Sequence, residues 1–180
     1  MNDHSVLSHP YETAHLPPGG AELGIEASAG QRAALANAYD LLVVERLVAT
    51  ATLTPAAAGT VTVEGRVIAD IVQACVVSLE PVVQHIDEPF SVRFAPAGSP
   101  GAQDPSAREI AVDPEAPDPP EVMEGTEIDV GALAEEIFVL AIDPYPRAPG
   151  AVLPAEAGTP PESSEESPFA VLRGVLPARK

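Results

Sequence analysis

The sequence of 180 residues has one cysteine, no tryptophan, four phenylalanines and three tyrosines. A single cysteine, Cys75, excludes an intramolecular disulfide, as expected of a protein in a reducing compartment. Cys75 lies in an apolar run, which favours a buried structural thiol over an activated nucleophile. With so few aromatic side chains, the core has to be built mainly from valine, leucine, isoleucine and alanine.

Basic residues are also scarce. Nine Lys and Arg residues stand against 27 Asp and Glu residues, which gives a formal net charge of −18. An acidic surface repels phosphate, and this disfavours non-specific binding to nucleic acid and to anionic lipid. The same charge attracts basic proteins and speeds encounters with them. The alternative is that much of the charge solvates disordered segments.

Long apolar runs are missing. No uninterrupted apolar stretch is long enough to span a membrane. The first twenty residues are polar and lack the apolar segment of a secretory signal. We therefore expect a soluble, cytoplasmic protein.

Motifs that would indicate catalysis are missing as well. The sequence has no Walker A loop, dinucleotide fingerprint, nucleophile elbow or zinc-protease helix. Its four histidines do not show metal-binding spacing, and His85 falls in an expected turn. The adjacent acids Glu135 and Glu136 point in different directions on a helix and indicate a solvated face. Basic residues interleaved with aromatics, the pattern of RNA-binding faces, are absent. We therefore predict no enzymatic activity, no cofactor and no metal site.

The middle of the chain has the two-residue period of β-strands. Apolar residues alternate with polar ones in two runs joined by a Pro/Gly turn, which predicts an antiparallel hairpin. In a later segment Phe90, Val92 and Phe94 share one face. The expected extended segments are residues 21–27, 46–54, 61–72, 75–82 and 88–96. Together they predict an antiparallel meander with one buried face.

Two helices are expected. Ser28 is a candidate N-cap for a short helix over 30–39, and Asp129 is a candidate N-cap for a later one. The later helix ends before Pro144 and Pro146. Its apolar positions repeat at helical spacing and are Val130, Leu133, Ala134, Ile137, Phe138 and Ala141. The predicted fold is α+β: an antiparallel sheet, open or barrel-like, covered by the late helix and the short early one.

Composition also suggests a division of the chain. We expect a flexible amino terminus over 1–15 and a single α+β domain over 16–151. An acidic, Pro-rich and disordered insertion is expected inside this domain, at about 97–121. An acidic low-complexity linker (152–167) and a carboxy-terminal docking tail (168–180) follow.

Three segments together resemble a known family. They are "CVVSLEPVVQHIDEPFSVRFAP" (75–96), "IDVGALAEEIFVLAIDPYPRAPGA" (128–151) and the later "SPFAVL". In their order and separation, within a stretch of about 16–172, they resemble the YceD family in its alphaproteobacterial form. This is the large ribosomal RNA subunit accumulation protein. The resemblance implies a role in 23S rRNA accumulation and large-subunit assembly, without an established enzymatic activity. The family's gene often lies beside that of a small basic ribosomal protein.

The chain departs from one common pattern of that family. Many members carry a Cys-x-x-Cys pair before "LEP" and a second cysteine pair after the late helix, which suggests a metal site. Here the first pair is reduced to Cys75, with Ser78 at the second position, and "YPRAPGA" replaces the later pair. A four-cysteine zinc site is therefore impossible in a monomer.

These observations lead to a first hypothesis of a non-catalytic ribosome biogenesis factor. Its partner would be a basic large-subunit ribosomal protein or a pre-ribosomal particle, and its contact with rRNA is left open. The candidate partner-binding residues are Ser78, Leu79, Glu80, Pro81, Glu135, Glu136, Tyr145 and Arg147. The alternative for "DPYPRAPG" is a simple helix stop, with Tyr145 packed and Arg147 solvated. The alternative functions are an rRNA-processing enzyme or direct rRNA-binding subunit, and a generic acidic adaptor.

Overall fold

A computed structural model describes residues 5–99, 119–123 and 125–152. The chain divides into two compact units, Met1–Ala148 and Pro149–Lys180. The fold below is that of the first unit, because only residues 149–152 of the second are described.

The first unit is built around an open sheet of five strands. The strands are β2 (Ala21–Glu26), β3 (Val43–Pro55), β4 (Val61–Ala74), β5 (Pro81–Ala95) and β6 (Glu121–Val122). Strands β2 to β5 pair antiparallel in sequence order, and β6 pairs in parallel with the end of β5. We call the face toward the core and α2 the inner face, and the opposite one the outer face.

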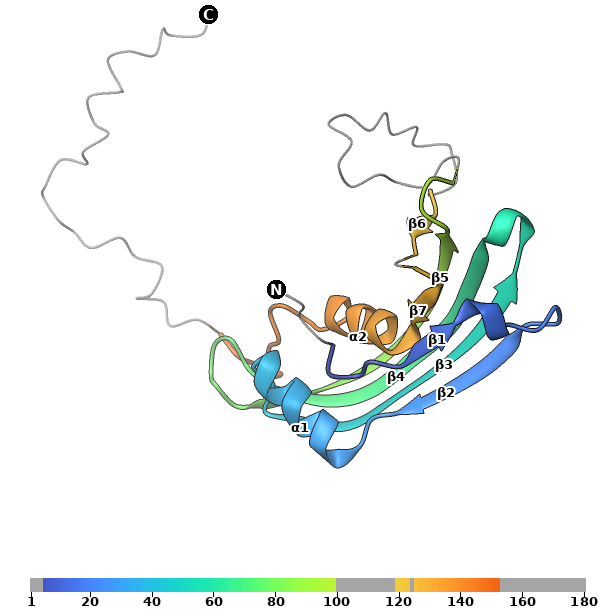
Figure 1. Ribbon diagram of the computed structural model, residues 1–180. Helices are drawn as coiled ribbons and strands as arrows, with labels where there is room; N and C mark the ends of the chain where they lie inside the picture. Colours follow the sequence, from blue (N-terminus) through green and yellow to red (C-terminus); the bar gives the residue numbers. More distant parts are fainter. Residues whose placement is uncertain (1–4, 100–118, 124, 153–180) are drawn as a thin grey trace, which may run out of the picture. The chain divides into compact units, whose positions relative to one another are not determined.

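Two helices and a short ribbon complete the unit. The ribbon pairs β1 (Pro10–Glu12) antiparallel with β7 (Glu127–Asp129). The helices are α1 (Ala29–Ala38) and α2 (Val130–Leu140), and 3-10 turns lie at Thr13–His15 (η1) and Ala57–Gly59 (η2). Figure 1 shows α2, β1 and β7 on the same side of the sheet.

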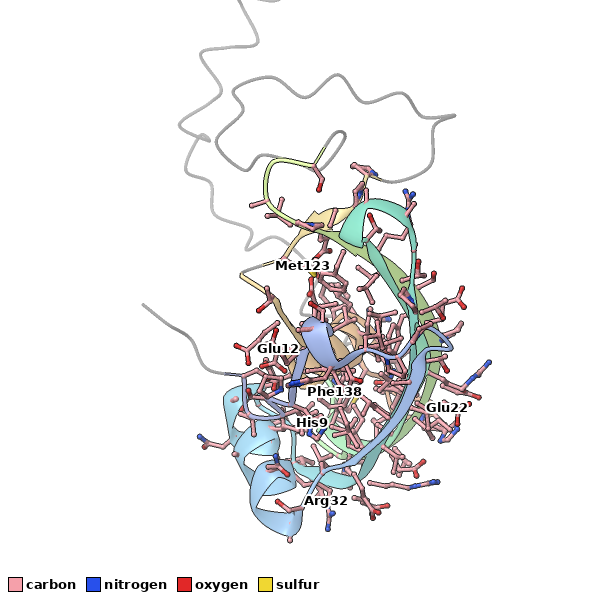
Figure 2. All side chains as sticks on the ribbon, turned by 45° about the vertical axis from the view of Figure 1, so that its right-hand side comes forward. His9, Glu12, Glu22, Arg32, Met123 and Phe138 are labelled. Atoms are coloured by element: carbon pink, nitrogen blue, oxygen red, sulfur yellow. The ribbon has the colours of Figure 1, made fainter. Side chains whose placement is uncertain are left out.

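The core follows the alternation of the strands. Its strand residues include Leu47, Ala49, Ala51 and Leu53 of β3 and Val61, Val63, Val67, Ala69 and Ile71 of β4. Phe138 of α2 is fully buried against them, and Figure 2 shows it inside the unit. Gly65 pairs directly with Phe90, and a Cβ atom at Gly65 would lie 2.5 Å from the Phe90 ring. The missing side chain therefore leaves room for the aromatic ring to cover this glycine.

Both helices begin as their sequences predict. Ser28 caps α1 in a capping box with Gln31, and Asp129 accepts the amide of Ala132 at the start of α2. Leu35 of α1 is fully buried, and the Tyr39 ring lies edge-on to Phe138 of α2. The α1 and α2 helices therefore pack into one core.

The predicted α+β class is confirmed, and the sheet is open, not a barrel. The prediction of an extended segment over 75–82 is wrong for Cys75–Glu80, which forms the loop between β4 and β5. His85 lies in β5 on the outer face and contacts Asp70, not in a turn. Within the described ranges, no helix is long and apolar enough to cross a membrane.

The structure agrees with the predicted division of the chain only in part. Residues 5–15 of the segment expected to be flexible provide β1, η1 and the buried Leu7. Of the expected insertion, residues 100–118 lie outside the described residues, whereas Glu121 and Val122 form β6. The expected linker and docking tail also lie outside them, except for residue 152.

Candidate partner-binding surface

The start of α2 receives the amino-terminal segment at very close range. A Cβ atom at Gly131 would lie 1.8 Å from the carbonyl oxygen of Leu7. Only glycine at this position allows the backbone around Leu7 to approach the helix so closely. The amide of Val130 also donates to the His9 carbonyl at 3.2 Å.

Glu135 fastens this segment and α1 to α2. Its carboxylate accepts hydrogen bonds from the Ser5 hydroxyl, from the Leu7 amide at 2.9 Å and from the Tyr39 hydroxyl at 2.7 Å. Glu135 is buried, so its predicted place on a solvated face is wrong, whereas Glu136 is exposed as predicted. Helical spacing could not reveal this, because the partners lie 96 to 130 residues away in the sequence.

Asp129 is the second carboxylate at this end. It accepts the amide of Ala132 at 2.9 Å, the amide of His9 at 2.7 Å and the hydroxyl of Ser8 at 2.7 Å. Partial burial acts to raise the pKa of Asp129. The hydrogen bonds, led by that from Ser8, outweigh burial and hold the pKa below its ordinary value.

The end of α2 is held by uncharged groups instead. Gln84 of β5 donates to the carbonyl of Ala141 at 2.8 Å and accepts the amide of Asp143 at 3.0 Å. Gln73 of β4 donates to the carbonyl of Asp143 at 2.9 Å. The two glutamines fix the backbone just after the helix against the sheet.

Cys75 joins this backbone to the loop between β4 and β5. Its sulfur accepts amides from Ala148 and Ser78 at 3.3 Å each and from Val77 at 3.4 Å. The amide of Val76 donates to the Pro146 carbonyl at 2.9 Å.

The hydrogen bond from Ala148, followed by those from Ser78, lowers the pKa of the Cys75 thiol to about 6. Burial of this fully shielded side chain acts in the opposite direction.

We call the loop Cys75–Glu80 and the turn Asp143–Ala148 together the junction. Large apolar side chains are exposed on it and on the adjoining strand ends: Leu42, Val43, Val76, Leu79, Val83 and Tyr145. Val43 pairs with Val72 and Val72 with Val83, which places these three in one row on the outer face. We call the six exposed residues the junction surface.

Leu79 stands out within the junction surface. Its side chain is 77% exposed, and its backbone adopts the left-handed region with φ of 62°. A bulky residue pays a steric penalty in this region, which glycine or asparagine avoids. A leucine in this conformation departs from the local backbone preference, and such departures concentrate at functional positions.

The structure brings most of the predicted partner-binding residues together. Ser78, Leu79, Glu80, Pro81, Tyr145 and Arg147 are exposed at or beside the junction. Tyr145 is 72% exposed, so the alternative in which it packs is wrong. Glu135 and Glu136 lie apart from this group, around a hollow of about 530 Å³ between α1, α2 and the amino-terminal segment.

Sequence reasoning missed the contribution of the strand ends. Leu42, Val43 and Val83 are exposed apolar residues at the ends of β3 and β5 next to the junction loop. The available signal was a valine on the polar face of an alternating strand. Val83 shares the outer face with His85 and Asp87, and this pattern can be recognised only once the full length of β5 is known.

A protein-family model matches the chain. The model described as "Large ribosomal RNA subunit accumulation protein YceD" covers residues 63–176, more than half of the chain. The chain belongs to the YceD family. The matched segment contains both halves of the junction and begins within β4. No curated protein and no solved structure matches the chain significantly.

The metal site suggested by other YceD sequences does not fit this chain. Cys75 is the only cysteine, and its sulfur already accepts three amides. The hydroxyl of Ser78 donates to the Glu80 carboxylate at 3.1 Å. Within the described ranges, no three His, Cys, Asp or Glu side chains gather as metal ligands. Hydrogen bonds to the Cys75 sulfur thus join the loop and the turn of the junction.

Proposed function

We propose that this chain is a non-catalytic cytoplasmic factor that supports 23S rRNA accumulation and large-subunit assembly through the junction surface. The proposal rests chiefly on the exposure of the Leu79 side chain together with its left-handed backbone conformation. Membership of the YceD family supplies the link to large-subunit rRNA.

The partner we propose is a basic large-subunit ribosomal protein, free or within a pre-ribosomal particle. Protein interfaces combine an apolar centre with a polar rim, and the junction surface offers apolar side chains beside the exposed Glu80, Asp143 and Arg147. The net charge of −18 favours a basic partner and speeds the encounter. It disfavours bare rRNA as the first contact.

The test is a pull-down of the tagged protein from growing cells, with and without ribonuclease, read by mass spectrometry. We expect a basic large-subunit protein to stay bound after ribonuclease treatment. The double variant Leu79→Asn/Tyr145→Ser should lose it, whereas Leu140→Ser should keep it. Leu140 is 75% exposed but lines the hollow beside α1 and is not part of the junction surface.

The same variants are then tested in cells depleted of the native protein. We expect Leu140→Ser to restore the 23S rRNA level and the junction double variant to fail. The proposal is wrong if depletion leaves large-subunit rRNA unchanged, or if the double variant retains both partner and rRNA.

A further inference from the structure

The two long edges of the sheet differ in how they are protected. The free edge of β5 carries Pro81 and Pro89, which have no N–H to offer an incoming strand. Strand β2, at the opposite end of the strand order, has no proline and no lysine. Among the described residues, no strand pairs with its outer edge. Such an edge is a template for a further strand.

The hydrogen-bonding groups at this edge can be assigned. The amide of Ala27 donates to the Leu47 carbonyl at 3.0 Å and continues the β2–β3 register. Inward and outward groups alternate along an antiparallel pair. The N–H and C=O groups of Glu22, Gly24 and Glu26 therefore point to the open edge.

These same three residues are exposed, and Glu22 and Glu26 place their side chains on the outer face on either side of Gly24. Figure 2 shows Glu22 on the far side of the sheet from Phe138. A strand added here would set side chains directly opposite Glu22, Gly24 and Glu26, at alternate positions. Two of these positions face a carboxylate and the middle one faces a bare glycine.

The middle position has room for a large side chain. A Cβ atom at Gly24 would meet nothing within 4 Å. A hollow of about 550 Å³ opens there and is lined in part by Glu22, Gly24, Thr50, Thr52 and Glu64. The same sheet already contains the matching arrangement, because Phe90 covers Gly65 directly across the strand pair.

We infer that the open edge of β2 accepts an extended basic segment of a partner protein as an additional strand, with the pattern basic–x–aromatic–x–basic. The inference rests on the proposed function and identifies a second contact for the same kind of partner. The pattern is symmetric about Gly24, so it fits a strand of either direction.

A second copy of the chain is a poor occupant of this edge. Two β2 strands pairing antiparallel about Gly24 would set Glu22 of each copy opposite Glu26 of the other. Like charges directly opposite one another destabilise a strand pair. The carboxylates of Glu22 and Glu26 thus disfavour pairing of β2 with a second copy and favour pairing with a basic strand.

The test titrates the full-length protein into a fluorescein-labelled peptide containing Lys-Val-Phe-Val-Lys and follows fluorescence anisotropy. Gly24→Pro removes the outward N–H without changing charge, and it should weaken binding about tenfold. Glu22→Lys/Glu26→Lys turns two attractive pairs into repulsive ones and should weaken binding by at least about tenfold. The control Glu45→Lys/Glu127→Lys changes net charge equally at exposed positions outside β2 and should retain binding.

Hydrogen exchange supplies the positional readout. We expect peptide binding to slow exchange at the Glu22, Gly24 and Glu26 amides. The inference is overturned if Gly24→Pro and the Glu22/Glu26 double variant bind normally, or if protection appears elsewhere. It is also overturned if single-stranded RNA protects these amides and the peptide does not.

Failure of this inference and failure of the proposed function leave different traces. If the junction variants lose the ribosomal partner in cells while the β2 variants behave normally, only the β2 contact is wrong. If the peptide protects β2 but depletion leaves 23S rRNA unchanged, the edge binds as inferred and the ribosomal role is wrong.

Discussion

The start and the end of α2 are fixed to the protein by different chemistry. At the start, Asp129 and Glu135 accept hydrogen bonds from the amino-terminal segment and from α1. At the end, Gln73 and Gln84 hold the backbone, and their contacts carry no charge. At the start, the polar groups are covered by other parts of the protein. Beyond the end, apolar side chains of the junction surface are exposed to solvent.

This difference separates stability from recognition along one helix. Substitutions at the start should lower the free energy of unfolding, because buried partners lose their hydrogen bonds. Substitutions in the junction surface beyond the end of the helix should leave folding nearly unchanged and weaken partner binding.

Gly131→Ala should have the largest effect. The added methyl group would collide with the Leu7 carbonyl, so the amino-terminal segment has to shift away from α2. We expect a loss of about 3 kcal/mol in the free energy of unfolding, measured by urea denaturation. Gly30→Ala is the matched control, because its methyl group meets nothing within 4 Å and should stabilise α1 by up to about 1 kcal/mol. Equal stability of the two variants would contradict the close approach.

Glu135→Ala should follow with a loss of about 2 kcal/mol, because the buried Leu7 amide and the Tyr39 hydroxyl lose their acceptor. Glu136→Ala changes the neighbouring exposed residue and should cost less than about 0.5 kcal/mol. Denaturation of both variants under one condition measures the contrast. Similar losses for both would mean that Glu135 does not anchor the amino-terminal segment.

Acid should loosen the start of α2 through Asp129. Its folded pKa lies below the unfolded value, so its contribution to stability is complete above the unfolded pKa of about 3.9. The contribution is lost as pH falls from there through the folded pKa. Stability measured between pH 6 and the acid limit should therefore fall less steeply in Asp129→Asn than in the native chain. Ser8→Ala, which removes one of the donors, should give an intermediate slope.

Leu79→Asn should change stability least, and in the opposite direction. Asparagine tolerates the left-handed region better than leucine, so the variant should unfold at equal or slightly higher urea concentration. Its binding to the ribosomal partner should fall at least about tenfold, as for loss of an interface anchor. Lower stability together with unchanged binding would assign Leu79 a purely structural role.

Local patterns predicted most of the fold. The alternation from Leu47 to Ile71 defined the central hairpin, and the Asp129 cap with the spacing up to Phe138 defined α2. They failed where a contact joins distant parts of the chain. Strands β1 and β7 are three residues each and form only by pairing with one another. From helical spacing alone Glu135 is predicted to be exposed. Its burial depends on the amino-terminal segment, which packs against it.

The proximity of the candidate residues could be predicted to the same extent, whereas their role in binding stays a prediction. The family motifs pointed to Ser78–Pro81 and to Tyr145, and the structure brings the two segments together through Cys75 and Val76. The row from Val43 to Val83 depends on strand register, which the sequence of one strand does not determine.

Photo-crosslinking in growing cells tests the central claim most directly. A benzophenone amino acid is placed at Tyr145 in one strain and at Leu140 in another, and crosslinked proteins are identified by mass spectrometry. The account predicts a basic large-subunit ribosomal protein crosslinked from position 145 and absent from position 140. The same partners from both positions, or no ribosomal protein from position 145, would contradict it.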